Sequence, residues 1–106
     1  MSHELSEKLT GLASRVNNLV VASTGDACRN LQQLEDQVTK YALVAIRLDL
    51  DEEEGSYKDA LAKVNTSITD IDNVDAALAK IGDTISSIKN VVDAVGQVLT
   101  EAATVL

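Results

Sequence analysis

The chain has 106 residues, the length of a single domain, and 45% of them are apolar, although tryptophan, phenylalanine and proline are absent. Its formal net charge is −8, and five of its acidic residues lie between Asp49 and Glu54. Nucleic acids and anionic lipid headgroups are bound by clustered Lys and Arg side chains, which neutralise phosphates. An acidic chain without a basic stripe is therefore not expected to bind nucleic acid, and it is poorly suited to a membrane surface.

The cysteine content and the hydropathy bear on the compartment. Cys28 is the single cysteine, so an internal disulfide is impossible, which fits a reducing compartment. The first residues, MSHELSEKLTGL, lack the basic and apolar regions of a secretory signal. The sequence also contains no apolar stretch of about 18 residues, the length that a membrane-spanning helix needs. We therefore expect a soluble, cytoplasmic protein.

Apolar residues in the first half of the chain recur in alternating steps of four and three, which is the pattern of a helix with one buried stripe. The series is interrupted in VVASTGDA, residues 20–27, where it shifts by one residue. Gly25 could end one helix and Asp26 could cap the next, or a single long helix could pass through. The residues of the two series are Leu5, Leu9, Leu12, Val16 and Leu19, then Ala27, Leu31, Leu34, Val38, Tyr41, Ala45 and Leu48.

The second half shows the same spacing, with one irregular step between residues 71 and 74. Strand-like alternation does not occur over a comparable length, so the sequence predicts an all-α fold. The series consists of Leu61, Val64, Ile68, Ile71, Val74, Leu78, Ile81, Ile85, Ile88, Val92, Val95, Leu99, Ala102 and Leu106.

The acidic segment is expected to be the turn between two antiparallel arms. Gly55 interrupts both series, and the sequence SYKD that follows has the form of a capping box, with Ser56 as N-cap and Asp59 in the position of the usual Glu. We therefore predict one domain, residues 1–106, with a first arm at 4–50, an acidic turn at 51–56 and a second arm at 57–105.

Two arrangements of these arms satisfy the pattern, and both give a four-helix bundle. Further apolar residues flank the stripes, and this extra width requires an additional helical neighbour. If the arms are continuous, each is about 70 Å long and two hairpins pair as a homodimer. If both arms break, near Gly25 and Gly82, a monomeric bundle forms from residues 4–23, 26–52, 57–80 and 83–105. The dimer is slightly preferred. The flanking residues are Val20, Val21, Ile46, Val91, Val98 and Val105.

The acidic segment does not match a helix–loop–helix calcium site. A loop starting at Asp49 has acidic residues at the third and fifth positions, but Glu54 stands where glycine is required and Ala60 where glutamate is required. His3 is the single histidine and lies close to the start of the chain, so a transition-metal site would lack ligands. We therefore predict no metal ligand.

Catalytic constellations are also missing from the sequence. His3 is the one possible imidazole base for Cys28 or a serine, and a di-iron bundle would need Glu-x-x-His pairs that the arms lack. The glycines are isolated, so no phosphate-binding loop is formed. We therefore predict that the protein is not an enzyme and has no catalytic residue and no cofactor.

The predicted function is a non-enzymatic one, in which the helices act through protein–protein contact, as a homo-oligomer or as an adaptor for a helical partner. The alternative is that the amphipathic stretch 77–99 of the second arm binds lipid or a membrane interface. The residues expected to form the core seam or a helix–helix interface are Leu31, Leu34, Val38, Ile68, Ile71, Leu78, Ile81, Ile85, Ile88, Val92, Val95 and Leu99.

Overall fold

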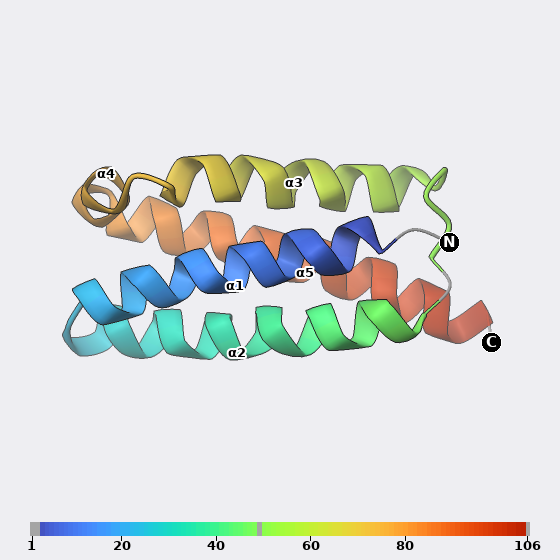
Figure 1. The fold of residues 1–106 in the computed structure, drawn as a ribbon, viewed down its shortest axis with the longest axis horizontal. Coiled ribbons are helices and arrows are strands. Elements are labelled where there is room, and N and C mark those ends of the chain that lie inside the picture. Colours follow the sequence, from blue (N-terminus) through green and yellow to red (C-terminus); the bar gives the residue numbers. More distant parts are fainter. Residues whose placement is uncertain (1–2, 49, 106) are drawn as a thin grey trace.

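The computed structural model describes residues 3–48 and 50–105, although not the side chains of residues 104 and 105. Over this part of the chain the fold is all-helical, as predicted (Figure 1). Its helices are α1 (Glu4–Ala22), α2 (Gly25–Arg47), α3 (Gly55–Ile71), α4 (Val74–Ala79) and α5 (Ile81–Val105).

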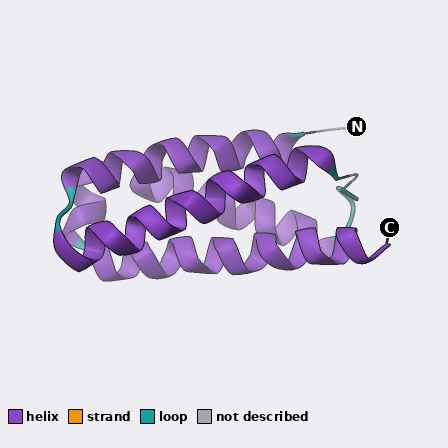
Figure 2. Ribbon diagram, turned by 90° about the horizontal axis from the view of Figure 1, so that it is seen from below, coloured by secondary structure: helices purple, strands orange, loops and turns teal. Residues whose placement is uncertain are grey.

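The four longer helices run side by side along the long axis of the molecule, and the short α4 closes one end (Figures 1 and 2). Both α1 and α5 pack against α2 and α3, so that α2 and α3 occupy opposite corners. The link between α2 and α3 therefore crosses the end of the bundle where α1 begins and α5 ends (Figure 1). The molecule measures 41 × 20 × 18 Å.

The first arm breaks between α1 and α2. The backbone N–H of Ser23 and its hydroxyl both donate to the Val20 carbonyl, at 3.3 and 3.1 Å, and Ser23 is extended, which ends α1. Gly25 then adopts φ +66°, in the left-handed region that favours glycine, and begins α2. The prediction that Gly25 ends a helix and Asp26 caps the next is wrong. Asp26 lies inside α2 and pairs with Arg29.

The second arm breaks twice. Asp72 and Asn73 separate α3 from α4, and the Asn73 side chain caps α4 by accepting the N–H of Ala76 at 3.1 Å. This break coincides with the irregular step of the apolar series. Lys80 separates α4 from α5, close to Gly82. Neither arm is therefore a continuous helix, and the long dimension of 41 Å is well below the length expected for an unbroken hairpin.

The link between α2 and α3 is organised by Asp51. Its carboxylate accepts the N–H of Glu53 at 3.0 Å and its carbonyl accepts the N–H of Glu54 at 3.1 Å, which is an Asx-type turn. Because α2 ends at Arg47 and α3 begins at Gly55, the link is longer at its start and shorter at its end than the predicted turn. Asp49 lies outside the described residues.

The predicted capping box at Ser56 does not form. Glu54 occupies the N-cap position of α3, without a side-chain capping bond, and Ser56 already lies in the first helical turn. The Ser56 hydroxyl instead donates to the Glu101 carboxylate of α5, at 3.0 Å. The serine therefore joins two neighbouring helices and does not satisfy its own helix end.

The core runs along the axis between the helices. From α1 it takes the complete stripe of leucine and valine side chains that the spacing predicted, and all five are buried. It also contains Tyr57, from the first turn of α3, and the whole stripe of α2 that faces α1 and α5. The α2 residues of the core are Leu31, Leu34, Val38, Ala42 and Ala45.

Substitution of the two glycines that the sequence places in similar contexts should have opposite effects. Gly25→Ala should lower the free energy of unfolding by about 1 kcal/mol, because an L-residue is strained at positive φ. Gly82→Ala should raise it by about 0.5 kcal/mol, because an added Cβ meets no atom within 4 Å and the unfolded chain loses freedom. Urea denaturation followed by circular dichroism measures both. Equal effects would contradict the left-handed conformation of Gly25.

Candidate functional site

The structure places the predicted seam residues at two levels of burial. Leu78, Ile81 and Ile85 are half-buried, as is Ile68, and they pack against the core from its edge. Leu78, Ile81 and Ile85 lie on α4 or in the first part of α5, where the short helix covers less surface. The remaining predicted residues are buried: Leu31, Leu34, Val38, Ile71, Ile88, Val92, Val95 and Leu99.

The apolar residues that flank the seams divide into two groups. Val91 and Val98 on α5 are buried, so the extra apolar width of this helix is covered within the chain. Val21 and Ile46 are instead exposed, at 79% and 50%. Val20 is half-buried against the core, and the side chain of residue 105 lies outside the described part. The flanking apolar residues Val21 on α1 and Ile46 on α2 are therefore not covered by the described part of the chain.

Two buried serines were not identified from the sequence. The Ser6 hydroxyl of α1 donates to the Ala42 carbonyl of α2 at 2.9 Å, and the Ser67 hydroxyl of α3 lies 3.1 Å from that of Ser87 on α5. Each bond fixes the lengthwise position of one helix against its neighbour. Ser67 could have been found, because it lies three residues after Val64 and four before Ile71, on the seam itself.

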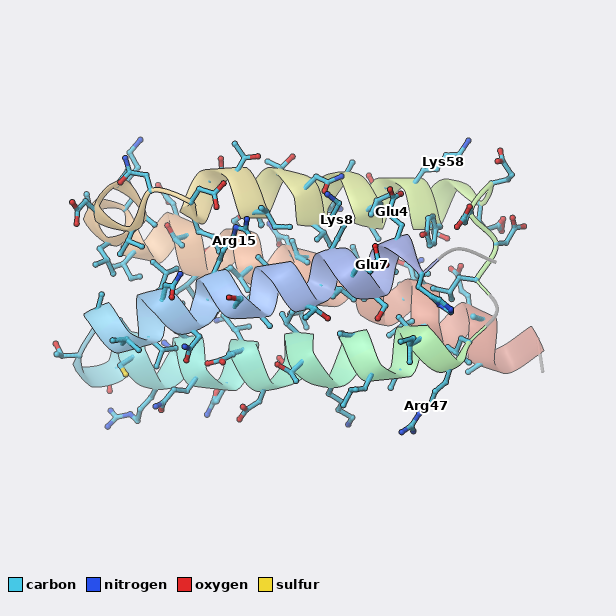
Figure 3. All side chains as sticks on the ribbon, in the orientation of Figure 1. Glu4, Glu7, Lys8, Arg15, Arg47 and Lys58 are labelled. Carbon is cyan, nitrogen blue, oxygen red and sulfur yellow. The ribbon has the colours of Figure 1, made fainter. Side chains whose placement is uncertain are left out.

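Arg15 fastens the α3–α4 link to α1. Its Nε donates to the Asp72 carboxylate and its Nη1 donates to the Gly11 carbonyl at 3.0 Å (Figure 3). The pair is partly exposed, so it is expected to contribute at most about 1 kcal/mol. The ion pair therefore positions the α3–α4 link, whereas the burial of the apolar core contributes most of the stability.

Tyr57 lies in the first turn of α3 and is 3% exposed. Burial raises the pKa of its phenol above the usual value, a hydrogen bond with the Leu5 backbone opposes this shift, and the nearby carboxylates of Glu52 and Glu4 reinforce it. The phenol therefore favours its neutral form in the folded chain.

The surface clefts do not resemble an enclosed small-molecule site. One cleft of about 310 Å³ lies between α3, α4 and α5 and is lined by Asp70, Lys80, Asp83 and Thr84 among others. It is open to solvent and mixes both signs of charge. Within residues 3–48 and 50–105, no group of three or more His, Cys, Asp or Glu side chains is placed to hold a metal ion.

The Cys28 and His3 side chains belong to no such group in the described ranges. Cys28 is half-buried at the α1–α2 break, where its Sγ lies 3.5 Å from the Val20 carbonyl oxygen. His3 is exposed just before α1. Among residues 3–48 and 50–105, no hydrogen bond links either side chain to a group with which it could form a nucleophile–base pair.

The outer side of α2 carries the exposed apolar residues that adjoin one another. Leu43 and Ile46 are 58% and 50% exposed and lie three residues apart, so their side chains are neighbours on the helix surface. Lys40 and Arg47 are exposed on the same side of the helix, and Arg47 points away from the bundle (Figure 3). We call these four residues the α2 face.

Among the described helices, none combines the length and the apolar composition that crossing a bilayer requires. Comparison with protein-family models, with curated proteins and with solved structures found no match to the chain. Proposals about its function therefore rest on the residues and their arrangement.

The buried phenol of Tyr57 should make the protein sensitive to alkaline pH. Because its folded pKa is raised, its contribution to stability is complete below the unfolded pKa of about 10 and is lost as the pH rises above that value. Tyr57→Phe lacks the titrating phenol. It should therefore lose less stability than the wild type between about pH 9 and pH 11, the range in which a tyrosine phenol titrates.

Thermal unfolding followed across this pH range measures the effect, with Tyr41→Phe as the matched control. Lysine deprotonation affects all three proteins alike, so the comparison isolates the phenol. An alkaline loss of stability in Tyr57→Phe equal to that of Tyr41→Phe would show that Tyr57 is not the responsible group.

Proposed function

We propose that the protein is a four-helix bundle, built from α1, α2, α3 and α5 with α4 as a connector, that acts through protein–protein contact and not through catalysis. The observation that carries this proposal is the α2 face. Leu43 and Ile46 are large aliphatic side chains, and both are at least half exposed. Exposed aliphatic residues are common singly, but adjacent ones rimmed by charged residues are typical of contact sites.

The α2 face is not explained by the folding of the chain itself. The core side of α2 is already covered by α1 and α5, and its buried residues make a continuous stripe. Leu43 and Ile46 lie off this stripe, so they add little to the core. Replacing them with polar residues would cost the fold little, and their presence therefore favours a role outside the chain.

The basic residues of the α2 face support a protein ligand. Lys40 and Arg47 lie seven residues apart, about 10 Å along the helix, at either end of the apolar pair. Neither forms an ion pair with another residue in the described ranges. An apolar centre with a charged rim is the usual arrangement of a protein-binding surface.

Lipid binding by the second arm is the competing proposal. It would require the bundle to open, because Ile88, Val92, Val95 and Leu99 on α5 are directed into the core. Half-buried Leu78, Ile81 and Ile85 make the α4 end the place where such opening would begin. Opening would expose the core residues of the other helices as well, which is a large free-energy cost.

Site-specific photo-crosslinking tests the proposed function. A benzophenone amino acid at Leu43 should form adducts with protein when the chain is expressed in its source cells. The matched control places the same group at Gln32, which is exposed on the same side of α2 about 16 Å away. Protein adducts at position 43 well above those at 32 are expected.

Two outcomes would contradict the proposal. One is equal labelling at both positions, which would mean that the α2 face makes no preferred protein contact. The other is the absence of protein adducts at position 43. Flotation of the wild-type chain on phosphatidylcholine vesicles would in that case favour lipid binding by the second arm.

A further inference from the structure

We propose that the α2 face binds the acidic link of a second copy of this chain, so that two copies pair about a twofold axis near Leu48. This inference rests on the proposed function, because it names the partner of the same surface. The acidic link is defined here as Asp51, Glu52, Glu53 and Glu54.

Charge complementarity is the first reason. All four residues of the acidic link are exposed. Glu53 lies 3.4 Å from the Lys58 ammonium, whereas Glu52 and Glu54 make no ion pair in the described part of the chain. Lys40 and Arg47 are likewise unpaired there. The protein therefore presents free cations and free anions close to one end of the same molecule.

In the described part of the chain, no ion pair joins the α2 face to the acidic link. The acidic link leads from the end of α2 across the bundle to α3, and α2 and α3 lie at opposite corners (Figure 1). The link therefore runs away from the outer side of α2, where Lys40 and Arg47 are exposed. Contact between these charges in two different molecules would satisfy both surfaces.

A twofold arrangement satisfies both surfaces of each copy. The α2 face and the acidic link lie on either side of Leu48 along the chain. An axis near Leu48 brings the face of each copy to the link of the other, so the same contact forms twice, as in an isologous dimer. Leu43 and Ile46 then pack against the backbone and side-chain stems of the partner's link.

The size of the contact sets the expected affinity. Each side offers two aliphatic side chains and a few charged residues, so the buried area is below the roughly 1,200 Å² of a standard stable interface. In addition, each copy has a net charge of −8, and this repels the other. The pair should therefore be weak and reversible, with a dissociation constant on the order of 100 µM.

Charge reversal on the two surfaces tests the inference by sedimentation at 10 µM to 1 mM. The wild type should shift from monomer toward dimer with concentration. Lys40→Glu/Arg47→Glu and Glu52→Lys/Glu54→Lys should each remain monomeric alone, with association at least about tenfold weaker. An equimolar mixture of the two variants should dimerise again, because each supplies the charges that the other now needs.

The mixture also separates local contact from net charge. Each reversed glutamate changes the charge by two units, so Glu52→Lys/Glu54→Lys carries −4 in place of −8. If repulsion between whole molecules governed association, this variant alone would dimerise more strongly than the wild type. The twofold contact predicts the opposite result.

The apolar part of the contact has its own matched pair of variants. Leu43→Ser should weaken dimerisation about tenfold or more, whereas Val21→Ser should leave it unchanged, because Val21 is exposed near the end of α1, where α1 joins α2. Both positions face solvent, so circular dichroism should show an intact fold in each variant.

A wild type that stays monomeric up to 1 mM, or a variant mixture that fails to dimerise, would overturn the inference. Protein adducts at position 43 that contain only other proteins would then still support the proposed contact function. Absence of any adduct at position 43 would instead overturn the proposed function itself.

Discussion

The structure depends on the burial of apolar stripes that are too wide to be covered when each helix has a single helical neighbour. A helix with a single narrow seam can be satisfied by one neighbour, but α5 buries Val91 and Val98 in addition to Val92, Val95 and Leu99. An isolated pair of helices leaves such flanks in water. The chain therefore folds each arm back on itself, which gives every long helix two long neighbours.

The breaks that make this possible are produced by local chemistry. Gly25 supplies the left-handed conformation at one break, and the Asn73 side chain caps α4 at another. The two arms can then shorten to a bundle 41 Å long. The bonds of Ser6 and Ser67 hold neighbouring helices in one lengthwise position, which apolar contacts alone specify less strictly.

Periodicity in the sequence was sufficient for the all-α fold, for the buried stripe of α1 and for the approximate place of the turn. It was not sufficient for the helix ends. Ser56 has the local pattern of a cap, but Glu101 on a helix 45 residues away takes its hydroxyl, and such a partner is invisible to a local pattern. Gly25 was expected to end a helix, but it begins α2. The local sequence does not distinguish these roles, because glycine occurs at both ends of helices.

The α2 face could not be predicted from the apolar spacing either. Residues 41–46, YALVAI, are apolar all round the helix, so spacing alone cannot say which of them face solvent. Only the positions of α1 and α5 leave Leu43 and Ile46 outside. The exposed pair is thus a consequence of the fold, and the proposed contact function follows from the way the first arm breaks.

The distance between α1 and the C-terminal half of α2 tests the folded-back first arm most directly. Spin labels at Glu7→Cys and Thr39→Cys, in a Cys28→Ser background diluted with unlabelled chain, report this distance within one molecule. The folded-back arm places the labels on adjacent helices, below about 30 Å apart. A separation near 48 Å, about 1.5 Å for each residue of an unbroken helix, would contradict the account.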